Sequence, residues 1–94
     1  MATSTVNVSV VTQVQIFPIE VQPTGFLFEL LDKNQFVLSH VENPTPEASF
    51  PEVPQGEQYT MRVTRNGVVA SIDFTVPKTV NDIAVPVSVS VSFA

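Results

Sequence analysis

The chain has no cysteine and no tryptophan among its 94 residues. Without cysteine it has no disulfide, no thiolate nucleophile and no thiolate metal ligand. Small secreted domains commonly depend on disulfides, so this absence favours a protein that folds in the cytoplasm. The first residues also lack the basic region and apolar run of a secretion signal. We therefore expect synthesis in the cytoplasm without export.

Basic residues are few, with four Lys and Arg against nine Asp and Glu and a net charge of −5. Nucleic-acid binding requires clustered Lys and Arg that neutralise phosphates, and anionic membrane surfaces attract the same side chains. No apolar run is long enough to cross a bilayer. The composition therefore predicts no nucleic-acid partner and no membrane partner.

Side chains that carry out catalysis or hold metals are also sparse. His40 is the only histidine, and no second histidine or patterned carboxylate completes a metal site or a catalytic triad around it. Asp32, Asn34 and Gln35 offer oxygen ligands, but the distal glutamate of an EF-hand loop is missing, which favours a turn. The sequence predicts no catalytic residue, no metal site and no cofactor.

The two terminal segments carry the clearest periodic pattern. Both are uncharged and alternate apolar with polar residues, as half-buried strands do. The alternating positions are Val6, Val8, Val10, Thr12, Val14 and Ile16, and then Ile83, Val85, Val87, Val89, Val91 and Phe93. At about 3.3 Å per residue each segment extends roughly 35 Å, about twice the length of an ordinary strand. Residues 1–16 and 83–94 are each predicted to form two strands or one strand with an overhanging arm.

Asn66-Gly67 predicts a hairpin, because a two-residue turn of this kind needs positive φ at both positions. The turn sets the register of the flanking strands. Arg65 then lies opposite Val68, and the apolar pairs that follow share one face. Those pairs are Val63 with Ala70, Met61 with Ile72, and Tyr59 with Phe74. Turn chemistry and hydrophobic pattern agree, which is evidence for a real hairpin.

A second hairpin is predicted around residues 32–35, between apolar runs at 26–31 and 36–41. Phe26, Phe28 and Leu30 form its inward set, which leaves Leu27 and Leu31 facing outward. The proline-bearing stretch 43–56 is predicted to be an extended loop that Phe50 anchors to the core, with a short strand at 48–50. The whole chain, 1–94, then forms a single all-β domain, an Ig-like antiparallel β-sandwich of about seven strands.

Two stretches resemble a known family. Asp32-Lys33-Asn34 ends one strand, and Phe50-Pro-Glu-Val-Pro-Gln-Gly-Glu-Gln-Tyr59 forms a turn into another. With the order of elements, they resemble immunoglobulin-like or fibronectin-type-III-like sandwiches. Over residues 26–76 they are similar to the transthyretin-like modules of bacterial and phage surface proteins. The resemblance implies binding or structural display, not catalysis. The cysteine pair and tryptophan of the antibody pattern are absent.

A partner surface is predicted from the uncharged terminal strands and the outward leucines. Exposed strand edges recruit other chains unless lysine, proline or bulges protect them. The interface set is Val6, Val8, Val10, Leu27, Leu31, Val87, Val89 and Val91. The alternative is that both terminal strands lie inside the sandwich, and that another strand or the proline-bearing loop covers Leu27 and Leu31.

Charged residues give a second, weaker signal. Glu42, Glu47, Glu52 and Glu57 recur through the proline-bearing stretch, either as an acidic docking surface or as a solvated loop. Arg62 and Arg65 lie near the predicted hairpin tip. They pair with that loop, with a neighbouring subunit, or with carboxylates on adjacent strands.

Together these features predict a non-enzymatic virion structural protein of a tailed bacteriophage, such as a capsid decoration or minor capsid protein. It would form homo-oligomers and bind the major capsid or another virion protein through strand and apolar contacts. The alternative is an adhesion or carbohydrate-binding module of a larger extracellular protein. With no tryptophan and one tyrosine, few residues can stack on sugars.

Overall fold

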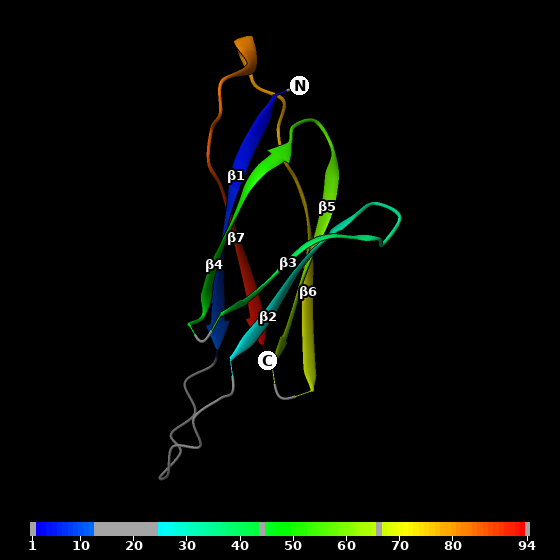
Figure 1. Cartoon of the computed structure of the whole chain (residues 1–94), viewed down its shortest axis with the longest axis vertical. Coiled ribbons are helices and arrows are strands. Elements are labelled where there is room, and N and C mark those ends of the chain that lie inside the picture. The colour runs from blue at the N-terminus through cyan, green and yellow to red at the C-terminus, as the bar shows by residue number, and fades with distance from the viewer. Residues whose placement is uncertain (1, 13–24, 44, 66, 94) are drawn as a thin grey trace.

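The computed structural model describes residues 2–12, 25–43, 45–65 and 67–93, and these form an all-β protein (Figure 1). The strands are β1 (Thr3–Thr12), β2 (Phe26–Asp32), β3 (Val37–Asn43), β4 (Glu47–Pro54), β5 (Gln58–Arg65), β6 (Val68–Thr75) and β7 (Val87–Phe93). A short 3-10 turn, η1 (Val80–Asp82), precedes β7. No helix in these ranges has the length and apolarity to cross a membrane.

The strands form two sheets, one in the order β4-β1-β7 and the other β3-β2-β5-β6. The predicted seven-stranded sandwich is confirmed. Within the described residues all neighbours are antiparallel except β1 and β7, which run parallel. The first two strands of an immunoglobulin constant domain share a sheet. Here β1 and β2 lie in opposite sheets, so the connectivity is a different one.

The β5–β6 hairpin has the register that its turn predicted. Arg65 pairs with Val68, and the series continues through Met61 with Ile72 to Tyr59 with Phe74. Gly67 has a φ of 78°, in the region that favours glycine. Asn66 lies outside the described residues. The second predicted hairpin is also confirmed, with β2 and β3 antiparallel and joined by a turn at 33–36.

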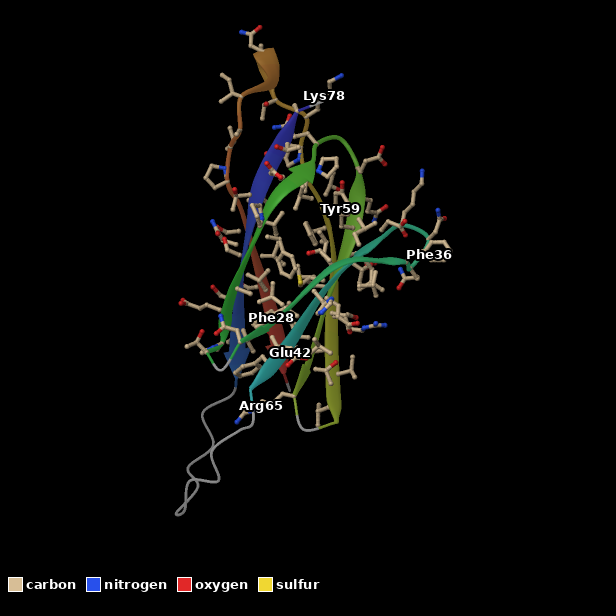
Figure 2. All side chains as sticks on the ribbon, in the orientation of Figure 1. Phe28, Phe36, Glu42, Tyr59, Arg65 and Lys78 are labelled. Carbon is tan, nitrogen blue, oxygen red and sulfur yellow. The ribbon has the colours of Figure 1, made fainter. Side chains whose placement is uncertain are left out.

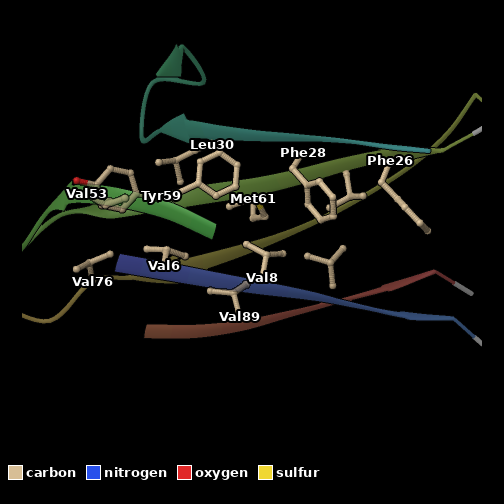
Figure 3. Close-up of a cluster of buried hydrophobic side chains, with 13 residues drawn as sticks. Val6, Val8, Phe26, Phe28, Leu30, Val53, Tyr59, Met61, Val76 and Val89 are labelled. Atoms are coloured by element: carbon tan, nitrogen blue, oxygen red, sulfur yellow. The ribbon is translucent and has the colours of Figure 1, made fainter. Parts of the chain in front are cut away.

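The core lies between the two sheets (Figure 3). One sheet contributes Phe26, Phe28, Leu30, Tyr59, Met61 and Val63, and the other contributes Val6, Val8, Phe50, Val53, Val89 and Val91. The predicted inward faces of β2 and β5 are therefore confirmed. In the C-terminal pattern only the part from Val87 onward is strand, and Ile83 and Val85 are exposed ahead of Pro86. Residues 13–16 of the N-terminal pattern lie outside the described ranges.

The short strand predicted at 48–50 within the loop 43–56 is confirmed, but it is longer than predicted, because residues 47–54 form β4. The prediction of a loop is wrong for the rest of that strand. β4 is an outer strand that pairs with β1 alone, and an outer strand accommodates proline on its unpaired side. A bulge between the pairs Ser4–Val53 and Val6–Phe50 places Glu52 at a φ of 59°. Phe50 is 1% exposed, so its predicted role as an anchor is confirmed.

Hydrogen bonds from two side chains stabilise the connection from β4 to β5. The hydroxyl of Tyr59 donates to the carbonyl of Pro54 at 2.7 Å, like the tyrosine corner of β-sandwiches. The amide nitrogen of Gln55 donates to the Thr3 carbonyl at 3.2 Å and to the Ile83 carbonyl at 2.9 Å. Its oxygen accepts from the backbone N–H of Thr79 at 3.1 Å. These bonds tie β1, the β4–β5 turn and the chain before β7 into one end of the sandwich.

Tyr59 makes the stability of the fold sensitive to alkaline pH. Burial, and secondarily the charge of Glu57, raises the pKa of its phenol above the ordinary value of 10.0. The unfolded chain therefore ionises first, and stability is lost as pH rises from about 10 through the folded pKa. We expect urea midpoints to fall in this range for the natural protein. The Tyr59→Phe variant should lose this part of the pH dependence.

Because the chain has one tyrosine, tyrosinate absorbance reports on this group alone. Titration of the native protein at the pKa of free tyrosine would contradict the buried position of the phenol.

Candidate interaction surface

The predicted interface residues of the terminal strands lie in the protein's own core. Val6, Val8, Val89 and Val91 are at most 5% exposed, and Val10 and Val87 are half-buried against the same cluster. The apolar faces of β1 and β7 therefore pack against the opposite sheet and are not available to a partner in this fold. β1 is also flanked by β4 and β7, which leaves it no free edge.

Leu31 was predicted to face outward into an interface, but it is only 1% exposed. It pairs with Thr60 on the outer face of its sheet, beside an irregularity in the β2–β3 register. The amide nitrogen of Gln35 donates to the Thr60 hydroxyl at 3.4 Å, which draws the β2–β3 turn over this face. Leu31 is therefore buried beside the point where the turn bonds to β5, while Leu27 is half-buried.

The four outer strands differ in how their edges are protected. β4 carries Pro51, Pro54 and a bulge, devices that block pairing with another chain. β3 has one acidic residue, Glu42, and a register irregularity where it pairs with Leu30 and Leu31 of β2. β7 is uncharged, and it lies close to β6 of the opposite sheet. β6 also has one acidic residue, Asp73, but no lysine, proline or bulge. It is therefore the least protected edge in the described part of the chain that also exposes apolar side chains.

Burial falls sharply between β5 and β6. Met61 and Val63 are fully buried in β5, whereas their neighbour Ile72 in β6 is 41% exposed. Val68, on the same inner face, is 57% exposed, and Val69 on the outer face is also 57% exposed. The sheet that contains β6 has four strands and faces a sheet of three. The opposite sheet therefore leaves part of β6 uncovered, and both faces of this outer strand present apolar side chains to solvent.

The tip of the β2–β3 hairpin forms a second apolar surface. Phe36, Val37 and Leu38 are 67%, 45% and 52% exposed, and Phe36 lies at the outer end of the hairpin (Figure 2). A carboxylate oxygen of Asp32 accepts hydrogen bonds from the backbone N–H groups of Asn34 at 2.9 Å and Phe36 at 3.0 Å. The Asp32 side chain thus acts as a turn former, as predicted, and holds Phe36 outward.

An open cleft of about 740 Å³ lies beside this tip. Its lining includes Asp32, Lys33, Leu38, Tyr59 and Lys78. The Tyr59 hydroxyl and the Asp32 carboxylate already bond to the chain's own backbone. Among the described residues, every buried side-chain nitrogen and oxygen has a hydrogen-bond partner, and no three His, Asp or Glu side chains gather into a metal site.

The remaining charged residues are mostly solvated. His40, Glu42, Glu47, Glu52 and Glu57 are all exposed. Arg62 donates to Glu29 on the neighbouring strand at 2.9 Å, and this hydrogen bond raises the pKa of its guanidinium. The Arg65 guanidinium lies 5.2 Å from the centre of the Phe26 ring. Arg62 is thus balanced by a carboxylate on an adjacent strand.

The chain matches no protein-family model and matches no curated protein with significance. The candidate surface at β6 and the β2–β3 hairpin tip is therefore defined by the geometry of the chain itself.

The sequence patterns did not identify β6 as an edge strand. The register of the β5–β6 hairpin does not reveal whether β2 will pair with β5 or with β6. The exposed pair Val68-Val69, on opposite faces of one strand, was the available signal.

Proposed function

We propose that this protein is a non-enzymatic structural component of a tailed bacteriophage virion, such as a capsid decoration or minor capsid protein. The observation that carries the proposal is the unprotected β6 edge, which has exposed apolar side chains on both faces. Such an edge is a template for pairing with another chain, and soluble monomers usually protect it. In a protein that assembles on a particle, this edge can pair with another chain.

Two further features support this proposal. The hairpin tip with Phe36 provides a second apolar contact, at the other outer strand of the same sheet as β6. The resemblance of residues 26–76 to transthyretin-like modules of phage surface proteins points in the same direction. In this function the two surfaces hold copies in place through non-covalent contacts, and the acidic residues remain in solvent.

Cosedimentation tests the proposal. Particles produced from a phage genome that lacks the gene for this chain should bind the purified protein and carry it through a density gradient. Mass spectrometry should also find the chain in intact natural particles. A protein that stays at the top of the gradient and is absent from natural particles would contradict the proposal. Binding to a glycan array would then favour the adhesion or carbohydrate-binding alternative, with the cleft beside Phe36 as its site.

A further inference from the structure

We infer that two copies of this chain pair antiparallel through their β6 strands, joining two four-stranded sheets into one continuous sheet. The inference rests on the proposed structural role, in which the dimer is the unit that assembles. It names the partner of the β6 edge as a second copy. The backbone, the side chains and the charges of β6 each support it.

The backbone of β6 offers donors and acceptors along its outer edge. Arg65 and Val68 flank the two-residue turn, so they form the hydrogen-bonded pair that closes the hairpin. Hydrogen-bonded pairs alternate along an antiparallel ladder. The N–H and C=O groups of Val69, Ser71 and Asp73 therefore point away from β5. In the described part of the chain no strand pairs with them.

The side chains of β6 favour a partner that meets its edge over one that covers a face. Ile72 and Val68 are exposed on the inner face, while Val69 is exposed on the outer face. A partner lying on either face alone would leave the other in water. A strand added at the edge lies beside β6 in the plane of the sheet. Its side chains then remove water from the side chains of β6 on both faces. β6 is the outer strand of its sheet and lies at one side of the molecule (Figure 1), and β7 of the opposite sheet lies close to it without pairing with its edge.

The charges of β6 make a second copy a suitable partner. Asp73 is the only charged residue in the strand, and its carboxylate accepts a 2.7 Å hydrogen bond from Thr60 of its own sheet. An antiparallel register centred on Ser71 places each Asp73 opposite Val69 of the other copy. The two carboxylates then do not face each other, although each chain carries a net charge of −5.

The same register is complementary on the inner face. It brings Ile72 beside Ala70 and Val68 beside Phe74, and the symmetry makes each contact twice. These cross-strand pairs are of the apolar and aromatic types that stabilise sheets. The strand is thus complementary to itself in hydrogen bonding, in apolar contact and in charge.

Light scattering of the purified full chain over a range of concentrations tests the inference. We expect the mass of a dimer at high concentration and of a monomer on dilution. Ser71→Pro removes an N–H on the free edge and leaves the ladder with β5 intact, so it should give a monomer at every concentration. Ser71→Ala keeps that N–H and is the matched control, which should dimerise as the natural chain does.

A second variant, Ile72→Lys, tests the inference if the proline of Ser71→Pro disrupts β6 itself. Ile72→Lys keeps its charge in water in the monomer but buries it in the dimer, so the dissociation constant should rise at least about tenfold. Its control is Leu38→Lys, which adds the same charge at a similarly exposed position far from β6. Urea unfolding confirms that each variant is folded.

A natural chain that is monomeric at all concentrations would overturn the inference, and so would a dimer that survives both Ser71→Pro and Ile72→Lys. A monomeric natural chain that pairs with another virion protein through β6 would likewise overturn the choice of partner. Particle binding is measured separately. If it persists without a dimer, only this inference fails, and if the dimer forms without particle binding, only the proposed function fails.

Discussion

Replacing Phe50 with alanine should lower the free energy of unfolding by about 3–5 kcal/mol, the cost of deleting a fully buried phenylalanine. Phe50 is 1% exposed and belongs to the core that joins the two sheets. It is also the main apolar anchor of the central part of β4, which has prolines at two positions. The loss is a large fraction of the roughly 5–15 kcal/mol by which small proteins are stable.

Urea unfolding measures this effect, and Phe36→Ala is its control. Phe36 is 67% exposed, so its replacement should change stability by less than about 0.5 kcal/mol. Equal losses for the two variants would contradict the assignment of residues 47–54 to a packed strand. They would favour the sequence-based prediction of an extended loop there.

Leu31→Ala should cost about 2–5 kcal/mol, although the alternation of β2 predicts an outward and inexpensive position. The physical reason is that Leu31 is 1% exposed although it lies on the outer face, beside Thr60, to which the β2–β3 turn is bonded through Gln35. The matched control is Leu38→Ala, since Leu38 is 52% exposed and its replacement should cost less than about 0.5 kcal/mol.

The Gln35→Ala variant separates the turn from the leucine. If the bond from Gln35 to Thr60 holds the turn in place, Gln35→Ala should raise the exchange rate of backbone amides in the turn while the core remains protected. A Leu31→Ala variant as stable as Leu38→Ala would show that the turn does not cover this face in solution.

The sequence predicted the local parts of the fold well. Asn66-Gly67 and the alternation beside it predicted every pair from Arg65–Val68 to Tyr59–Phe74, because turn geometry and side-chain period act on the same few residues. The inward positions of Phe28 and Met61 followed from the same period. These features depend only on residues that are close to one another in the sequence.

The features that the sequence could not predict depend on neighbours in space. β4 forms a strand despite Pro51 and Pro54 because it is an outer strand, and its place in the sheet is not visible in its own residues. The prediction for Leu31 failed because this outer-face side chain is buried beside Thr60, where the turn bonds to β5. The terminal valines were assigned to an interface because an uncharged strand in the core and one at an interface have the same pattern. The exposed edge at β6 depends on β2 pairing with β5 instead of β6.

Amide hydrogen exchange along β6, at low and at high protein concentration, tests the β6 edge most directly. The N–H groups of Ala70 and Ile72 point to β5 and should exchange slowly at both concentrations. Those of Val69, Ser71 and Asp73 point to the free edge, so they should exchange rapidly when the protein is dilute and slowly when it is concentrated. Rapid exchange of these three at every concentration, with Ala70 and Ile72 protected, would show that the edge stays unpaired and would contradict its role in self-assembly.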